Sequence, residues 1–241
     1  MFFLVQLIIF IFGIIIGSFL NSIIWRASNG KSIFLGRSQC VHCDRQLLWR
    51  DLVPLASFFF QKGQCRYCAK AISPQYPLVE FFTGVSFLLI VNLTSHDLLN
   101  LIFLFFVTSI LIILFVSDLR YLSLPINIII FGAIAGFLFN IFLGGAWYNF
   151  LLGSMIGAVF FGLQYLLSRG KWIGEGDIYL GGLIGAVLGF PGVFYATTIS
   201  YVFGALVAIF LLARKQAKLE SKLPLGTFLA LGTFITILLL K

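Results

Sequence analysis

Long apolar segments separated by short polar ones make up most of this chain. The apolar runs cover residues 3–24, 77–95, 98–117, 125–144, 148–168, 178–190, 193–213 and 224–240. An α-helix needs about 20 apolar residues to cross the hydrocarbon core of a bilayer. Transmembrane β-strands would instead alternate over about 10 residues. The pattern therefore predicts an all-α polytopic membrane protein.

The segment 178–213 decides how many helices there are. At 1.5 Å per residue it is too long for one helix across a core of about 30 Å, yet short for two. Gly189-Phe190-Pro191-Gly192 supplies a turn near its middle. Dividing the segment there gives eight transmembrane helices. We expect the glycines in this region, such as Gly181, Gly182 and Gly185, to permit close helix packing.

The distribution of basic residues supports this division. The net charge is +8, and the basic residues lie between the apolar runs. With residues 26–76 inside, eight spans place 15 of the 16 lysines and arginines on one side, and only Lys241 outside. A single span over 178–213 would move the basic cluster at 214–222 to the other face, against the positive-inside rule. The prediction is that both termini are outside and that no nucleic acid is bound.

Residues 26–76 differ in composition from the rest of the chain, since they carry eight basic residues, two acidic ones and all four cysteines. They follow a first transmembrane helix at 1–25 and predict a small cytoplasmic domain that is drawn to anionic lipid headgroups. Cys40 and Cys43 form one C-x2-C pair, and Cys65 and Cys68 form a second. This spacing predicts a four-thiolate zinc site, which is structural because no coordination position stays open. A redox dithiol pair is the alternative.

Two aspartates stand at the ends of apolar runs. Asp118 follows the run 98–117, and Asp177 follows Gly174-Glu175-Gly176 before the run 178–190. In the eight-span topology both carboxylates lie at the cytoplasmic ends of their helices. An aspartate at lipid depth costs about 2.5 kcal/mol or more, so it usually faces a polar cavity and has a partner. Two neighbouring carboxylates share a proton, which is the electrostatic basis of aspartic-protease chemistry.

The surroundings of these aspartates allow two interpretations. Gly174 and Gly176 permit a peptide main chain to approach Asp177 closely, as a protease substrate requires. Alternatively each aspartate is a structural cap at a helix end, with Asp118 paired to Arg120. The pair, the glycines and the shared side of the membrane favour catalysis.

Further motifs accompany the aspartates and Leu124-Pro125. They are Gly17-Ser18-Phe19-Leu20-Asn21, Gly36-Arg37-Ser38-Gln39-Cys40, Asp51-Leu52-Val53-Pro54-Leu55 and Tyr76-Pro77-Leu78-Val79-Glu80. Together with the cysteine loop, these motifs resemble those of the type IV prepilin peptidases, the bifunctional leader peptidase and N-methyltransferase family.

The resemblance implies an aspartic endopeptidase of the bacterial cell membrane, with Asp118 and Asp177 as its dyad in a seven-helix peptidase domain over 77–241. Such an enzyme cuts the basic leader from type IV pilin-like precursors at the cytoplasmic face. The family commonly then methylates the new N-terminus with S-adenosyl-L-methionine, an activity that the resemblance assigns to the region 26–76. Tyr179 stands where family members usually have a lysine.

Two other functions stay open. A presenilin-type protease also uses a GxGD aspartate but cuts within the bilayer, and the cysteine loop and the motif at 17–21 argue against it. A non-catalytic membrane scaffold would use the zinc module to bind a partner.

Overall fold

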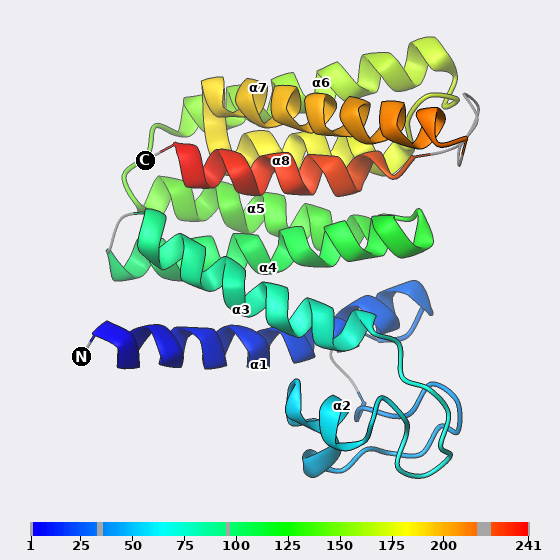
Figure 1. Cartoon of the computed structure of the whole chain (residues 1–241). Helices are drawn as coiled ribbons and strands as arrows, with labels where there is room; N and C mark the ends of the chain where they lie inside the picture. The colour runs from blue at the N-terminus through cyan, green and yellow to red at the C-terminus, as the bar shows by residue number, and fades with distance from the viewer. Residues whose placement is uncertain (1, 33–35, 95–96, 216–222, 241) are drawn as a thin grey trace. The chain divides into compact units, whose positions relative to one another are not determined.

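The computed structural model describes residues 2–32, 36–94, 97–215 and 223–240 and is predominantly helical (Figure 1). Within these ranges the β-structure consists of two isolated antiparallel bridges. The predicted all-α class is therefore confirmed. The elements are α1 (Phe2–Ser28), the 3-10 turn η1 (Trp49–Asp51), α2 (Ala56–Phe60), α3 (Gln75–Leu93), α4 (Leu98–Tyr121), α5 (Ile126–Phe142), α6 (Trp147–Ser168), α7 (Glu175–Ala213) and α8 (Leu225–Leu239).

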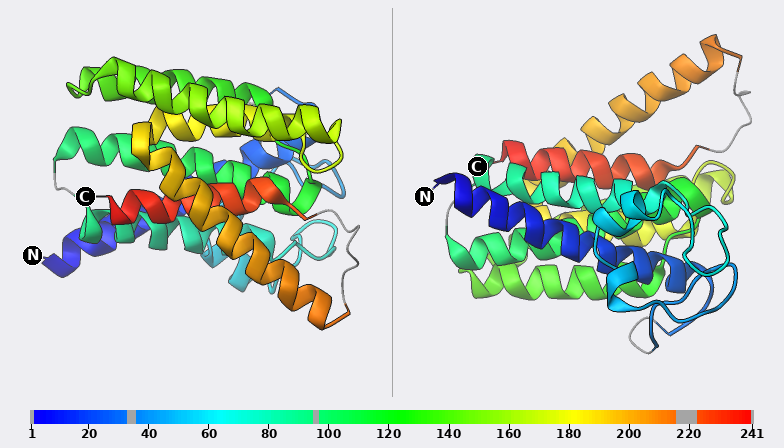
Figure 2. Two further views of the ribbon diagram at one scale, coloured as in Figure 1. Left: turned by 90° about the horizontal axis from the view of Figure 1, so that it is seen from above. Right: turned by 60° about the horizontal axis from the view of Figure 1, so that its bottom comes forward.

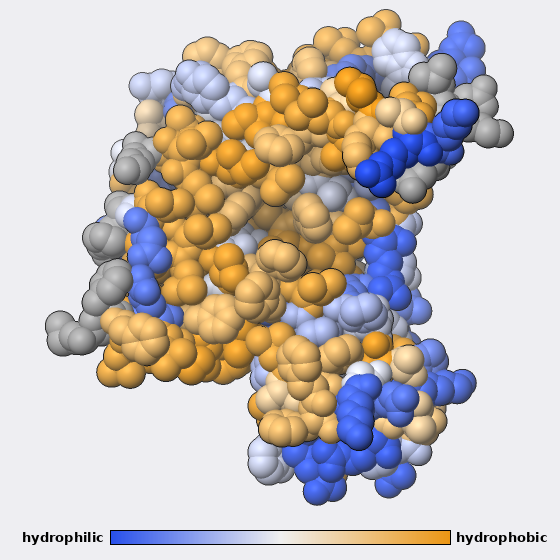
Figure 3. Space-filling model, viewed as in Figure 1, coloured by the Kyte–Doolittle hydropathy of each residue, from blue (hydrophilic) through white to orange (hydrophobic). Residues whose placement is uncertain are grey.

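Five of these helices have the length and composition to cross a membrane, namely α1, α3, α4, α6 and α7. The helices α5 and α8 are equally apolar but have 17 and 15 residues. Large apolar side chains cover much of the surface (Figure 3), as expected where lipid replaces water.

Helix α7 consists of two parts that run in opposite directions. Its 39 residues are interrupted at Gly189, with φ 63° and ψ −168°, and at the extended Phe190, directly before Pro191. Gly181 in the first part packs against the ring of Phe161, and Tyr201 in the second part stacks on the same ring. Both views in Figure 2 show the second part leaving the first at a sharp angle. The predicted break between 178–190 and 193–213 is present.

Contacts divide the chain into two compact units, Met1–Asn92 and Leu93–Lys241. In the first unit α1 and α3 approach so closely that a β-carbon on Gly13 would lie 2.7 Å from Gly84 Cα. In the second unit Gly181 and Gly185 of α7 lie against the backbone of α6 in the same way. The expected role in close helix packing is confirmed for these two glycines, whereas Gly182 lies in ordinary contact with side chains of α6.

Candidate functional site

Asp118 lies in the last turn of α4 and is buried. Its Oδ2 accepts hydrogen bonds from the Thr227 backbone N–H at 2.8 Å and from the Thr227 hydroxyl at 3.3 Å. Thr227 belongs to the first turn of α8, where backbone N–H groups have no acceptor within the helix. The carboxylate of Asp118 therefore completes the N-terminus of α8.

Asp177 accepts a backbone hydrogen bond at the N-terminus of its own helix, α7, as Asp118 does at the N-terminus of α8. It is the third residue of α7 and is buried, and its Oδ2 accepts a hydrogen bond from the Gly174 N–H at 2.9 Å. The partial positive charge of a helix N-terminus favours a carboxylate at this place. Both aspartates are thus fixed by backbone donors at helix ends.

Leu124, in the turn between α4 and α5, links the two aspartates. A β-carbon on Gly176 would lie 2.9 Å from Leu124 Cβ, and one on Gly226 would lie 3.1 Å from Leu124 Cδ1. The neighbours of both aspartates therefore pack on the same leucine. The structure brings together the pair that the sequence predicts.

The sequence interpretation missed three residues of this site. Gly226 lies directly beside Asp118, since a β-carbon there would lie 3.0 Å from Asp118 Oδ2. Thr227 fixes that carboxylate, and the hydroxyl of Ser117 is buried without a hydrogen-bond partner in the described structure. The available signal was Pro224-Leu225-Gly226-Thr227 at the start of the last apolar run, where a proline before a helix marks its N-terminus.

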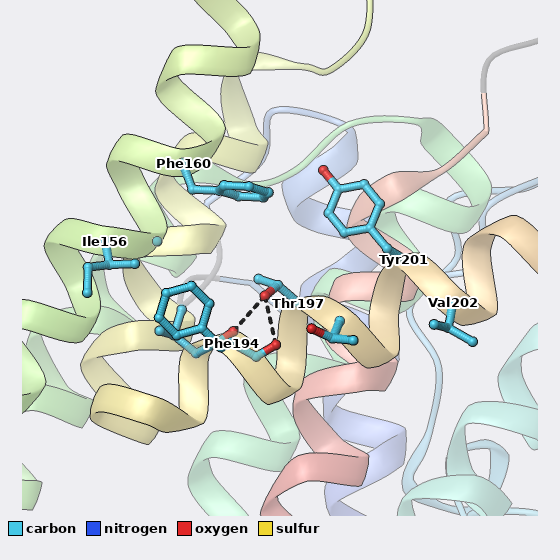
Figure 4. Close-up of a pocket in the computed structure, with 9 residues that line it drawn as sticks. Ile156, Phe160, Phe194, Thr197, Tyr201 and Val202 are labelled. Atoms are coloured by element: carbon cyan, nitrogen blue, oxygen red, sulfur yellow. Dashed lines mark hydrogen bonds between the residues drawn. The ribbon is translucent and has the colours of Figure 1, made fainter.

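A cavity of about 340 Å³ lies between α6 and the second part of α7 (Figure 4). Tyr201 lines it and donates a hydrogen bond from its hydroxyl to Gln164 Oε1 at 2.9 Å. The hydroxyl of Thr197 lies 2.8 Å from the Val193 carbonyl and 3.0 Å from that of Phe194, so it is used within its own helix. The cavity consequently suits an apolar occupant.

The four cysteines form a separate cluster in the N-terminal unit. Their sulfur atoms all lie within 4.8 Å of one another, and those of Cys40 and Cys68 are 3.9 Å apart. Tetrahedral zinc with Zn–S distances of about 2.3 Å requires sulfur atoms about 3.8 Å apart. The donor set and its spacing therefore fit a metal ion, and His42 is not part of the cluster.

Both C-x2-C segments form the same turn. In each, the N–H of the first cysteine donates to the carbonyl of the residue five positions later. The N–H of the residue four positions later donates back to the carbonyl of that cysteine. Burial raises the pKa of the Cys40 thiol to about 11. At Cys65 burial is outweighed by hydrogen bonds from the Tyr67 and Cys68 N–H groups and the neighbouring thiols, which lower its pKa to about 7. One thiol of the cluster is thus readily deprotonated for metal binding.

Asp51 organises the loop around the second cysteine pair. Its side chain is 2% exposed and forms an ion pair with Arg66 Nε at 2.9 Å. It also accepts hydrogen bonds from the Tyr67 hydroxyl at 3.0 Å and from the Leu48 N–H at 3.1 Å. A buried carboxylate is stable in such a network because its acceptor positions are used.

Three of the sequence motifs converge on Glu80, a buried residue of α3. The Leu55 N–H donates to Glu80 Oε2 at 2.7 Å, and the Ser18 hydroxyl is a second donor. Leu55 adopts the strained conformation φ 60°, ψ −54°. On the facing helix Asn21 donates to the Tyr76 carbonyl, but its own Oδ1 is buried without a partner in the described residues. This polar cluster lies within the N-terminal unit.

Comparison with known proteins assigns both parts of the chain. Residues 11–94 match the bacterial peptidase A24 N-terminal domain, and residues 105–209 match the type IV leader peptidase family. No solved structure matches the chain.

Several relatives share the name prepilin leader peptidase/N-methyltransferase. The protein of Bacillus subtilis is 35% identical over 96% of this chain and 93% of its own length. That of Myxococcus xanthus is 31% identical over 85% of this chain and 62% of its own length. That of Klebsiella pneumoniae is 33% identical over 75% and 84%, respectively.

Proposed function

The chain belongs to the type IV leader peptidase family and is a peptidase; we propose that it cleaves the leader from type IV pilin-like precursors by an aspartic mechanism. The observation that carries the mechanism is the pair of buried carboxylates, Asp118 and Asp177, held around Leu124. Substrates of this kind are suggested by the names of the relatives. The apolar cavity beside Tyr201 supports a substrate with an apolar segment.

The proposed dyad shares one proton between its two carboxyl groups. The ionised carboxylate accepts a proton from water, which attacks the scissile carbonyl, while the protonated carboxyl group donates to the carbonyl oxygen. The hydrogen bonds from Thr227 and Gly174 engage Oδ2 of Asp118 and Asp177, respectively. We assign the reacting positions to Oδ1 of each aspartate.

Asn substitutions separate catalysis from capping. The amide oxygen of Asn still accepts the backbone N–H bonds, so Asp118→Asn and Asp177→Asn should insert into the membrane and fold. Each should lose at least about 10³-fold in precursor cleavage, because neither proton transfer role survives. The double variant should be hardly worse than either single one, since the two groups act as a unit. Substantial cleavage by either single variant would refute the dyad and favour structural caps.

We also propose eight membrane crossings, with both termini outside and the aspartates at the cytoplasmic face. The reversal within α7 and the basic residues beside the helix ends support this topology. Lys218 and Lys222 of the basic cluster lie outside the described residues. Cysteines introduced at Trp172 and Arg214 should react with a membrane-impermeant thiol reagent from the same side, and one at Trp147 from the other. The chain without added cysteine is the control.

For the cysteine loop we propose a structural zinc ion bound by Cys40, Cys43, Cys65 and Cys68, supported by the sulfur spacing. Methylation of the new N-terminus with S-adenosyl-L-methionine is proposed from the names of the relatives. Glu80 and Asn21 fit such a reaction, because their buried oxygen atoms are acceptors for an ammonium group. S-adenosyl-L-methionine, which supplies the methyl group, and a newly cleaved N-terminus both carry one.

A further inference from the structure

Three aromatic side chains of the cysteine loop are turned away from its interior. Trp49 is 81% exposed, Phe59 is 71% exposed and Phe60 is 86% exposed. They belong to η1 and to the end of α2, which meet where Gln61 Nε2 lies 3.5 Å from Asp51 Oδ1. We call Trp49, Phe59 and Phe60 the aromatic patch. Exposed aromatic residues in such a group mark an interaction surface.

Other side chains of the loop do face its interior. Phe58 is the aromatic residue of α2 that packs inward, where its ring lies 3.2 Å from the position of a β-carbon on Gly63. Asp51 and the cysteines hold the adjoining segments in place. Phe58 and the buried Cys40 and Cys65 therefore face the inside of the loop, whereas the patch is available to something outside it.

Basic residues flank the patch. Arg50 directly follows Trp49, and Lys62 lies two positions after Phe60. The side chains of Arg50 and Lys62 are both exposed. Between residues 45 and 70, all of which the structure describes, Asp51 is the one acidic residue, and its side chain is buried and paired with Arg66. In Figure 3 the lobe formed by the loop carries apolar surface beside hydrophilic surface. This combination fits an anionic, apolar partner such as a lipid interface.

The loop is also tethered to two helices that have the length and composition to cross a membrane. It leaves α1 at Ser28 and returns at Gln75, so both ends are tied to helices that cross the membrane. The Leu55 N–H, at the start of α2, contacts Glu80, five residues into α3. This places the start of α2 about 7 Å along α3 at 1.5 Å per residue. The headgroup region on each side of a bilayer is about 5–7 Å thick.

We propose that the aromatic patch inserts into the boundary between headgroups and acyl chains of the membrane that α1 and α3 cross, while Arg50 and Lys62 bind anionic headgroups. The amphipathic rings of tryptophan and the apolar rings of phenylalanine suit this zone. The anchored loop lies flat on the bilayer. The proposal does not depend on the catalytic role of the aspartates.

The test uses the full-length, metal-loaded protein in nanodiscs. Lipids with a nitroxide near the headgroup should quench a fluorescence component that Trp49→Phe lacks. Phe59→Ser combined with Phe60→Ser should weaken this quenching and raise deuterium uptake of residues 48–63 several-fold, with zinc content unchanged. Val41→Ser, at an exposed apolar position outside the patch, is the matched control and should change neither measurement.

The charged part is tested by lipid composition. Adding phosphatidylglycerol to phosphatidylcholine nanodiscs should lower deuterium uptake of residues 48–63, and Arg50→Gln with Lys62→Gln should abolish that difference. Trp49 fluorescence that no membrane quencher reaches, with uptake unaffected by the serine substitutions, would overturn the proposal. A rise in KM for the precursor without lipid quenching would also overturn it, by making the patch a substrate surface. Either result would leave the aspartate tests unaffected.

Discussion

Substituting Gly226 by alanine tests whether catalysis depends on where Asp118 is held. The new β-carbon would lie 3.0 Å from Asp118 Oδ2 and 3.1 Å from Asp118 Cγ, whereas ordinary contacts are 3.4–4 Å. The carboxylate must therefore move by about 0.4 Å. A displacement of 1 Å from productive geometry can cost about 10²-fold, so we expect kcat/KM for precursor cleavage to fall about 3- to 10-fold.

Stability should not fall in parallel. Alanine gains up to about 1 kcal/mol over glycine in a helix, which offsets the small shift of Asp118. Gly162→Ala is the matched control, because the nearest atom to its β-carbon is Ile178 Cγ2 at 4.0 Å. It should retain full activity and equal or higher thermal stability in reconstituted membranes. A Gly226→Ala enzyme that cleaves at the normal rate, while Asp118→Asn is inactive, would refute the positional argument.

Three further predictions concern the N-terminal unit. Cys65→Ser should remove most of the bound zinc, measured on the purified protein, because three thiolates leave the tetrahedral site incomplete; full retention would contradict the four-thiolate site. The affinity for zinc should also fall more steeply with decreasing pH below about 7, the pKa of the metal-free Cys65 thiol, because protons then compete for this thiolate as well, and a competing metal-sensitive dye would report the affinity. Glu80→Ala should raise deuterium uptake at the Leu55 amide by removing its acceptor, whereas Glu80→Gln should preserve protection; equal uptake in both variants would disprove this contact.

The candidate site was only partly predictable from the sequence. Asp118 and Asp177 stand out because charged residues are rare beside apolar runs, and few acidic residues compete with them. The residues that donate hydrogen bonds to these aspartates were harder to predict from the sequence. Gly174 is local to Asp177, but Thr227 follows Asp118 by more than 100 residues and is brought to it only by the packing of α8.

The positions of the apolar helices and the grouping of the four cysteines could be predicted from the sequence itself. A helix at lipid depth satisfies its backbone within the segment, so its position follows from composition alone, and even the reversal of α7 follows from a local Gly-Phe-Pro-Gly turn. Tertiary structure alone decided that Leu124 packs against both aspartate motifs, that three separate motifs meet at Glu80, and that Phe58 turns inward while Phe59 and Phe60 face outward. These outcomes depend on which helix surfaces fit together, and no single segment carries that information.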